Sequence, residues 1–348
     1  MITAESLILQ AKERGASDIH LIAGLPAKFR VDGALYNMAE TPLDEEDCQR
    51  IARDLAGKDW PIYETTGELD AAGTFEGVRC RIHIFRRQGL PSVALRLLRD
   101  NIPDLSKLGL PPAALLLPEL HKGIVLVTGE TGSGKSTTLA AMIDRINHTR
   151  RDHIVTLEDP VEYIYTPDLA AINQREVGKD TASFSAGLRA SLREDPNVIL
   201  IGEMRDRETI ETAITAAETG HLVFGTLHTG SAADSVDRIV QIFPEGMQNQ
   251  IRLQLSMTLQ AVLTQLLLPK KGGGRALACE MMVVTDAVRN LIRSGNTPQI
   301  ANAISTSAAV GGQTMDQALV RLVRSGQITK DTALHFAKDA DYVKKNAM

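Results

Sequence analysis

The spacing of apolar and polar residues changes near residue 120 of the chain. Before that point, stretches with apolar residues at helical spacing predict helices at 2–14 and 44–56. Short runs rich in strand-forming residues predict strands at 17–24, 27–38, 78–87 and 92–99. The first hundred residues therefore indicate a small α+β domain.

From residue 121 onward, apolar runs alternate with amphipathic stretches. The apolar runs predict strands at 123–128, 153–158, 197–203 and 221–228, and the amphipathic stretches predict helices at 136–147, 183–193 and 207–219. This alternation predicts a mainly parallel sheet covered by helices, which places the chain in the α/β class. Beyond residue 243 the pattern becomes largely helical, including one long helix over 248–268 with its apolar residues on one face.

A proline-rich stretch separates these two parts. Residues 100–114 contain three prolines and one glycine, a composition typical of connections between domains. We therefore predict an N-terminal domain over 1–100, a linker over 101–114, and a second domain with C-terminal helices over 115–348.

The segment GETGSGKST at 129–137 fits the pattern G-x-x-x-x-G-K-S/T and lies between a predicted strand and a predicted helix. Glycines let such a loop fold around phosphates, and the following helix N-terminus adds partial positive charge. Lys135 would reach the β- and γ-phosphates, and Ser136 would ligate Mg²⁺. The loop thus predicts a nucleoside triphosphate site. Its predicted nucleotide-binding residues are Gly129, Thr131, Gly132, Ser133, Gly134, Lys135, Ser136 and Thr137.

Carboxylates follow two of the predicted strands. Glu158 and Glu162 bound the segment EDPVE, and Glu203 closes the apolar run VILIG. Hydrolysis of a triphosphate requires one carboxylate to orient water and another to hold the hydration shell of Mg²⁺. Glu203 stands where a Walker B acid is expected, but glycine replaces the usual preceding aspartate. The second carboxylate role therefore shifts to the 158–162 segment, where Glu158 is assigned to nucleotide binding. The competing interpretation is that these acids are helix caps and solvated loop charges.

Two histidines and two arginines are further candidates. His221 and His228 mark the two ends of the fourth predicted strand, a spacing that does not suit one metal-chelating face. Each is interpreted either as a structural residue or as a γ-phosphate sensor or subunit contact. Arg81 and Arg96 lie in strands of the first domain, where a solvated strand face is the simpler interpretation. Arginines supplied by a neighbouring subunit nevertheless accelerate hydrolysis by about 10³–10⁵-fold in other NTPases.

Composition narrows the class of protein. The 348 residues carry a formal net charge of −5, and 43% of them are hydrophobic, which is ordinary for a globular protein and gives little support to a nucleic-acid-coating role. Three separated cysteines, Cys48, Cys80 and Cys279, indicate a reducing compartment and exclude a four-cysteine zinc site within the chain. The N-terminus lacks a signal-peptide pattern, and no window approaches the roughly 18 apolar residues of a membrane span, so we expect a cytoplasmic protein.

Together these motifs resemble those of the secretion and pilus ATPases, in particular the PilT type, the motors of type IV pilus retraction. The similarity extends over nearly the whole chain. It is carried by ASDIHL at 16–21, GETGSGKSTTLA at 129–140, VTLEDPVEY at 155–163, NVILIGEMRD at 197–206, TAAETGHLVFGTLHT at 215–229 and VRNLIRSGN at 288–296. The lack of a four-cysteine zinc element, and a first domain that starts at residue 1, favour the short retraction form over its extension and secretion relatives.

The resemblance implies a PAS-like N-terminal domain joined to a RecA-like ATPase domain with a helical C-terminal region. It implies a homohexamer that binds ATP and Mg²⁺. The partners implied are a PilC-like inner-membrane pilus platform protein and a paralogous pilus ATPase, with the hexamer docked at the inner face of the cytoplasmic membrane at the pilus base. Neither zinc nor nucleic acid is expected as a partner.

The resemblance also implies roles for individual residues. Glu162 would be the catalytic glutamate, and Glu203 the Walker B acid that holds Mg²⁺, partly through water, together with Ser136. His221 and His228 would be the His-box residues.

Arg81 and Arg96 resemble the arginines that reach the nucleotide of a neighbouring subunit, with Arg79 as the alternative to Arg81. We therefore expect a Mg²⁺-dependent ATPase that powers type IV pilus retraction. A motor for pilus extension, type II secretion or DNA uptake would share every phosphate-site residue. The remaining alternatives are a nucleic-acid translocase with a RecA core and an inactive regulator of another pilus ATPase.

Overall fold

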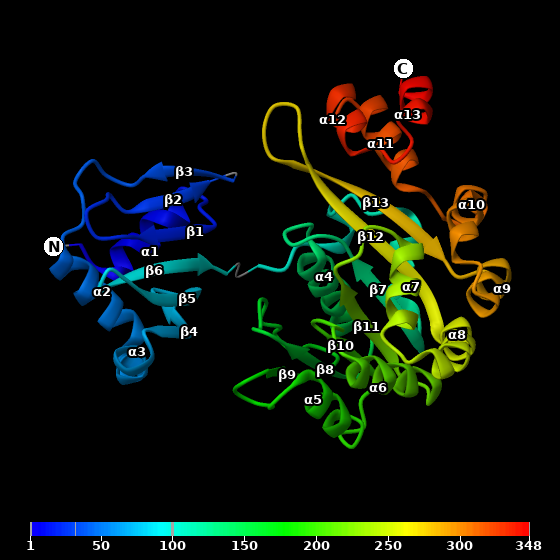
Figure 1. Ribbon diagram of the computed structural model, residues 1–348, viewed down its shortest axis with the longest axis horizontal. Coiled ribbons are helices and arrows are strands. Elements are labelled where there is room, and N and C mark those ends of the chain that lie inside the picture. The colour runs from blue at the N-terminus through cyan, green and yellow to red at the C-terminus, as the bar shows by residue number, and fades with distance from the viewer. Residues whose placement is uncertain (1, 32, 99–100, 348) are drawn as a thin grey trace. The chain divides into compact units, whose positions relative to one another are not determined.

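The computed structural model describes residues 2–31, 33–98 and 101–347, and the chain divides into two compact units, Met1–Asn101 and Ile102–Met348 (Figure 1). Each unit has its own hydrophobic core. The predicted domain boundary at residue 100 lies outside the described residues. Within those residues, we find no helix that is both long and apolar enough to cross a bilayer.

The first unit is an antiparallel sheet of six strands in the order β3-β2-β1-β6-β5-β4. Its helices are α1 (Ala4–Glu13), α2 (Glu45–Ala56) and α3 (Trp60–Thr66). Its strands are β1 (Asp18–Leu21), β2 (Lys28–Val31), β3 (Ala34–Asn37), β4 (Glu68–Phe75), β5 (Val78–Arg87) and β6 (Leu90–Leu97). Helices α1 and α2 pack their apolar residues against one face of the sheet to form the core.

Most elements of this unit follow the predicted pattern. Along β5, Val78, Cys80, Ile82 and Ile84 are buried and the residues between them are less so, as the alternation predicts. Strand β4 and helix α3 were not predicted. The sequence of β4, ELDAAGTF, contains small residues that weaken its alternation, and α3 is only seven residues long.

The second unit is built on a sheet of seven strands in the order β13-β12-β7-β11-β10-β8-β9. Only the β12–β13 pair is antiparallel. The strands are β7 (Gly123–Thr128), β8 (His153–Glu158), β9 (Ala171–Glu176), β10 (Val198–Ile201), β11 (Leu222–Leu227), β12 (Leu259–Pro269) and β13 (Arg275–Val283). The predicted α/β class is therefore confirmed.

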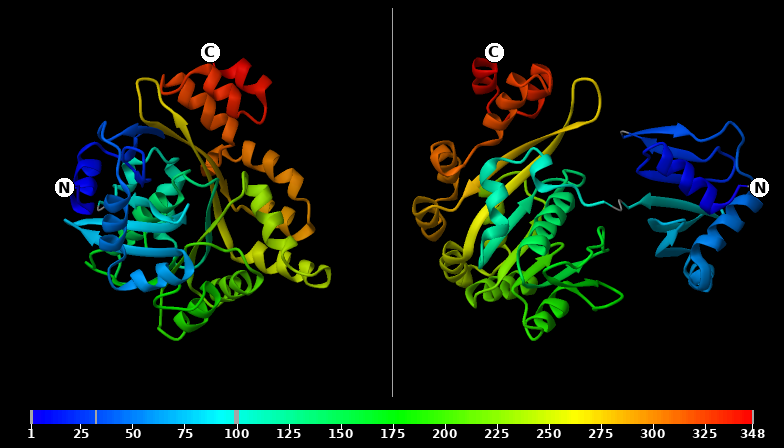
Figure 2. Two further views of the ribbon diagram at one scale, coloured as in Figure 1. Left: turned by 60° about the vertical axis from the view of Figure 1, so that its left-hand side comes forward. Right: turned by 180° about the vertical axis from the view of Figure 1, so that it is seen from behind.

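Helices cover both faces of this sheet (Figure 2). Helix α4 and residues 105–117 pack on one face, and the helices from α5 to α10 pack on the other. Their bounds are α4 (Lys135–Thr149), α5 (Phe184–Ser191), α6 (Arg207–Glu218), α7 (Ala232–Gln241), α8 (Glu245–Thr258), α9 (Asp286–Ser294) and α10 (Ile300–Ser305).

A third group of helices packs beside the β12–β13 hairpin. These are α11 (Met315–Arg324), α12 (Lys330–Phe336) and α13 (Ala340–Asn346). Leu268 and Ala276 of the hairpin share a small core with them, and Lys271 N–H donates to the carbonyl oxygen of Gln327 at 2.8 Å. The hairpin thus joins the central sheet to the C-terminal helices.

The single long helix predicted over 248–268 is wrong. Helix α8 ends at Thr258, and the following residues form β12, which pairs in parallel with β7 and antiparallel with β13. Apolar residues spaced by three or four within a largely apolar run suit a buried strand as well as a helix. These residues form a strand because they pair with two neighbouring strands. Local spacing does not encode that pairing.

The predicted linker also needs a correction. Leu105 and Ala114 are buried in the core of the second unit, and two short 3₁₀ helices, Leu105–Lys107 and Pro112–Glu119, form within and just beyond the segment. Prolines exclude a regular helix or strand there, but they do not prevent packing. Residues 105–114 therefore belong to the second unit and do not form a free linker.

Candidate functional site

The loop between β7 and α4 is tightly wrapped because its glycines adopt left-handed backbone angles. Gly129 has φ of 135°, and Gly134, the N-cap of α4, has φ of 94°. A Cβ on Gly129 would collide with the carbonyl oxygen of Gln265 on β12, so glycine is required there. The loop therefore runs close against β12 and leads into the N-terminus of α4, an arrangement that favours phosphate binding.

Lys135 is folded back into this loop. Its Nζ donates to the carbonyl oxygens of Gly129 and Glu130 at 2.7 and 2.9 Å. Burial lowers the pKa of Lys135, and the charges of Glu203 and Glu162 oppose that shift. An ammonium group with two acidic neighbours thus lies beside the loop where phosphates would bind.

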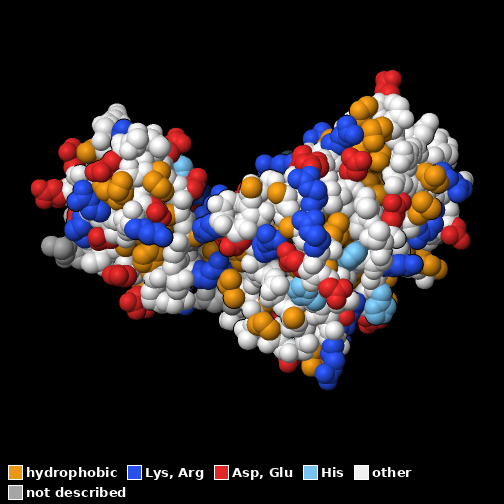
Figure 3. All heavy atoms as spheres, turned by 90° about the horizontal axis from the view of Figure 1, so that it is seen from below, with side chains coloured by type: hydrophobic (Ala, Val, Ile, Leu, Met, Phe, Trp, Pro, Cys, Tyr) orange, Lys and Arg blue, Asp and Glu red, His pale blue; other side chains and the backbone are white. Residues whose placement is uncertain are grey.

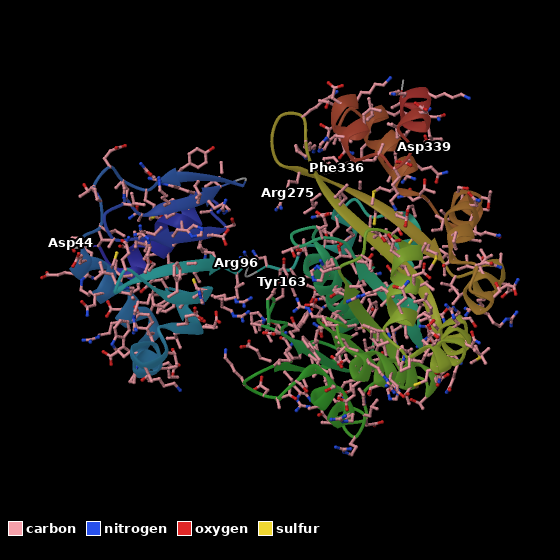
Figure 4. The ribbon with its side chains drawn as sticks, in the orientation of Figure 1. Asp44, Arg96, Tyr163, Arg275, Phe336 and Asp339 are labelled. Atoms are coloured by element: carbon pink, nitrogen blue, oxygen red, sulfur yellow. The ribbon has the colours of Figure 1, made fainter. Side chains whose placement is uncertain are left out.

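One hydroxyl of the loop lacks a hydrogen-bond partner, and one hydroxyl of the following helix has a partner from another segment. Ser133 Oγ is buried and has no hydrogen-bond partner within the described residues, which is the environment that a phosphate oxygen would satisfy. Thr137 Oγ1 lies 2.9 Å from Oη of Tyr163, a residue that is labelled in Figure 4. Tyr163 follows β8 and therefore ties the segment after that strand to α4.

The carboxylate of Glu158, at the end of β8, is held by hydrogen bonds. Its Oε1 accepts from Thr156 Oγ1 at 2.7 Å and from Gln174 Nε2 at 3.3 Å. Burial raises the pKa of Glu158, and these hydrogen bonds, with one from the backbone N–H of Glu162, act against that rise. Glu158 is thus fixed in place and orders the turn that carries Glu162.

Glu203 follows β10 and is paired with two basic side chains. Its Oε1 lies 3.2 Å from Nε2 of His228, which follows β11, and it also accepts from Arg205 Nε. The side chain of Glu203 is 19% exposed. Because β10 and β11 are parallel neighbours, their carboxyl ends bring Glu203 and His228 together.

A single cavity collects the main candidates. Its lining includes Ser136 at the start of α4, Glu158 and Glu162 after β8, and Glu203 after β10. These residues come from three separate stretches of sequence. The cavity lies at the carboxyl edge of the parallel strands, the usual place for ligands in open α/β sheets.

The structure does not bring His221 to this cavity. His221 precedes β11 and lies at the opposite end of that strand from His228. Its Nδ1 is 2.8 Å from the carbonyl oxygen of Ala216 and 3.2 Å from Thr219 Oγ1. Within one chain, therefore, His221 supports the turn between α6 and β11.

Arg81 and Arg96 lie directly opposite each other on β5 and β6 of the first unit. Both residues are exposed, and Arg96 Nε is 3.0 Å from Asp18 Oδ1. Arg79, two residues before Arg81, is opposite Thr74 on β4. Of the two candidates on β5, Arg81 is thus the one that forms a cross-strand pair with Arg96.

Several supporting residues were missed at the sequence level. On β12, Thr264 Oγ1 lies 2.9 Å from Thr128 Oγ1, and Gln265 Nε2 donates to Thr138 Oγ1 at 2.6 Å. These contacts could not be predicted while 248–268 was expected to be a helix. Arg205 was visible in GEMRD, but nothing in the spacing indicated that it pairs with Glu203.

The donor set fits a Mg²⁺ ion shared with phosphates. Ser136 and Glu203 provide a hydroxyl and a carboxylate, the hard oxygen ligands that Mg²⁺ prefers. Across the described ranges, no group of three or more His, Cys, Asp or Glu side chains could hold a metal. A metal here would therefore depend on oxygens of the nucleotide and water, as is usual for Mg²⁺.

Known proteins match nearly the whole chain. The family model described as Type II/IV secretion system protein matches residues 2–334. The type IV pilus retraction ATPase PilT of Pseudomonas aeruginosa is 44% identical over 340 residues, 97% of this chain and 98% of that protein. The type IV pilus ATPase PilU of the same organism is 37% identical over 340 residues, 97% of this chain and 89% of that protein.

The fold of the chain is also similar to that of a solved structure. A crystal structure of the pilus retraction motor PilT with bound ADP has a TM-score of 0.91 and 46% sequence identity, covering 99% of this chain and 100% of that one. The chain therefore belongs to the Type II/IV secretion system protein family, among its PilT-type ATPases.

Proposed function

We propose that this chain is an ATP-hydrolysing motor that powers type IV pilus retraction. The observation that carries the proposal is the cavity that gathers Ser136, Glu162 and Glu203 beside the phosphate loop. The similarity to PilT over nearly the full length of both chains supports retraction as the work that hydrolysis drives.

In the proposed reaction, the phosphates bind at the N-terminus of α4 and Lys135 turns from the loop carbonyls toward them. Ser136 and Glu203 would hold Mg²⁺, and the ion would supply positive charge that stabilises the phosphates. Glu162 orients the attacking water and accepts its proton. His228, 3.2 Å from Glu203 Oε1, keeps that carboxylate in position. His221 is left out of this set because it lies at the other end of β11.

The arginines of the first unit are proposed to act on a neighbouring subunit's nucleotide. Arg81 and Arg96 form an exposed, adjacent basic pair. No arginine of the part of the chain that the structure describes lines the hydrolytic cavity of the second unit. A homohexamer would let one subunit supply these arginines to the next.

Removing Arg81 should slow hydrolysis without preventing nucleotide binding. Arg81→Ala is expected to lower kcat by about 10–100-fold, since Arg96 retains part of the stabilising charge. Subunits carrying Arg81→Ala, mixed with subunits carrying Lys135→Ala, should recover turnover, because a mixed interface combines an intact loop with an intact arginine. Wild-type kcat in Arg81→Ala, or no recovery on mixing, would contradict arginine supply between subunits.

The working location follows from the proposed function. We infer that the hexamer is cytoplasmic and docks onto an inner-membrane pilus platform protein at the pilus base. A paralogous ATPase is a further proposed partner, since PilT and PilU both occur in Pseudomonas aeruginosa.

Two other functions are compared with pilus retraction. A motor for pilus extension, type II secretion or DNA uptake would use the same phosphate site. A nucleic-acid translocase would require a strongly basic binding surface. The net charge of −5 argues against it, and acidic and basic side chains are interspersed on the face shown in Figure 3.

Deleting the gene tests retraction directly. We expect surface pili to be retained or to increase in number, with twitching motility lost, because extension continues without disassembly. Complementation with the wild-type gene should restore motility, and complementation with the Glu162→Gln variant should not. A strain without surface pili would instead identify an extension motor.

A further inference from the structure

A carboxylate far from the phosphate loop in sequence is buried beside the segment that carries His228. Glu280 lies on β13 and is 5% exposed. Its Oε1 accepts the backbone N–H of Ala232 at 2.8 Å, and its Oε2 lies 3.7 Å from Nζ of Lys338. Burying a carboxylate is costly unless it is well paired, so this arrangement holds the two segments together.

Ala232 is the first residue of α7, and the residues just before it are bound to the first turn of that helix. Ser231 is the N-cap, and its Oγ accepts the N–H of Asp234 at 3.0 Å. Ser235 Oγ donates to the carbonyl oxygen of Ser231 at 2.7 Å, and it lies 2.6 Å from Thr229 Oγ1. The three residues that follow His228 are therefore attached to the start of α7.

These contacts form an unbroken path from β13 to the hydrolytic cavity. Glu280 holds the N-terminus of α7, where a negative charge is also favoured by the helix dipole. The first turn of α7 holds Thr229 and Ser231, and Thr229 directly follows His228 in the chain. His228 in turn lies 3.2 Å from Glu203 Oε1.

We propose that Glu280 is a positioning residue for hydrolysis: it anchors the start of α7 to β13 so that His228 stays beside Glu203. This inference rests on the proposed roles of His228 and Glu203. Glu280 is not among the residues that line the cavity, so in this proposal it acts only through His228. It should therefore affect the rate of the chemical step and leave nucleotide binding unchanged.

The C-terminal helices offer a matched control. Asp316 on α11 is also a buried carboxylate that accepts backbone N–H groups, those of Lys338 and Asp339 at 2.9 and 3.0 Å. Asp339 is labelled among these helices in Figure 4. Asp316 is linked to Glu280 through Lys338, whose half-exposed Nζ lies 3.7 Å from Glu280 Oε2, and exposed ion pairs of this kind contribute little. The hydrogen bonds that Asp316 accepts do not involve α7. Asp316→Asn should therefore change thermal stability but leave kcat unchanged.

The experiment is a double-mutant cycle on the full-length protein. Glu280→Leu removes the acceptor for Ala232, and we expect kcat to fall about tenfold, with KM for ATP and the Kd of a fluorescent ADP analogue within about twofold of wild type. Glu280→Gln keeps an acceptor oxygen and should retain at least about half of the wild-type kcat. In a His228→Ala background, adding Glu280→Leu should lower kcat by less than about twofold, because the two residues act as a unit.

Each outcome decides the matter. Equal losses from Glu280→Leu in both backgrounds, or a rise in KM that matches the fall in kcat, would overturn the inference. If His228→Ala slows turnover and Glu280→Leu does not, only this inference fails. If His228→Ala retains full kcat, the proposed role of His228 fails and the inference fails with it. Should Glu280→Leu not fold, Ser235→Ala breaks the next contact of the same path and must show the same dependence on His228.

Discussion

Replacing Lys135 with alanine is expected to abolish ATP hydrolysis. Lys135 Nζ is held by two loop carbonyls at 2.7 and 2.9 Å, so it is ready to turn toward the phosphates. Among the described residues, no lysine or arginine that could replace it lines the adjacent cavity. We expect kcat to fall at least about 10³-fold, because both phosphate affinity and stabilisation of the transferred phosphoryl group are lost. Steady-state phosphate release and binding of a fluorescent ATP analogue would measure the two effects.

A matched lysine variant tests whether the loss of hydrolysis in Lys135→Ala comes from its position in the phosphate loop or from the loss of one positive charge. Lys122 is exposed at the opposite end of β7 from the phosphate loop. Lys122→Ala should keep wild-type turnover and nucleotide affinity. If Lys135→Ala hydrolyses ATP as fast as Lys122→Ala, the phosphate loop is not the site of hydrolysis.

Replacing Glu162 with glutamine should block hydrolysis while ATP remains bound. Glu162 lines the cavity next to Ser136 and Glu203, and a neutral amide of the same shape cannot accept a proton from water. General base catalysis contributes about 10²–10⁴-fold, so we expect kcat to fall by about that factor with nucleotide affinity within a few-fold of wild type. Rapid-quench measurement of the first turnover would check it.

The binding result distinguishes Glu162 from Lys135. Lys135→Ala should lose both binding and turnover, and Glu162→Gln only turnover. Glu211 is exposed on α6, and its carboxylate lies 3.7 Å from Arg207 Nε. It provides a control, since exposed ion pairs contribute little. A burst of product formation in Glu162→Gln equal to that of wild type would assign the base to another residue.

Local pattern was sufficient for four of the seven strands in the sheet of the second unit. The strands of β7, β8, β10 and β11 were predicted to within a few residues, because apolar runs bounded by polar loops leave little choice of element. The failure at 248–268 has a physical cause. Its apolar residues fit a helix face and a two-sided buried strand equally well, and pairing of β12 with β7 and β13 decided between them.

The candidate site divides in the same way. Gly129–Thr137, Glu162 and Glu203 were identified because phosphate chemistry requires those residue types at strand ends. Gln265, Arg205 and Glu280 were not, because their roles depend on contacts made across the folded chain. Gln265 and Glu280 come from two strands that meet beside the loop and α7 only after the sheet has formed.

By itself, the sequence determined that the chain has a loop that binds a nucleoside triphosphate. It also determined that two of the later strands are followed by carboxylate side chains. Glycine spacing and strand periodicity are local properties, so they can be recognised in the sequence without knowledge of the fold. Only the tertiary structure decided that Glu203 lies beside His228 and that His221 supports the turn between α6 and β11. It also decided that Glu280 holds the start of α7. The reason is that side chains from separate strands become neighbours through strand order and register, which are set by packing of the whole sheet.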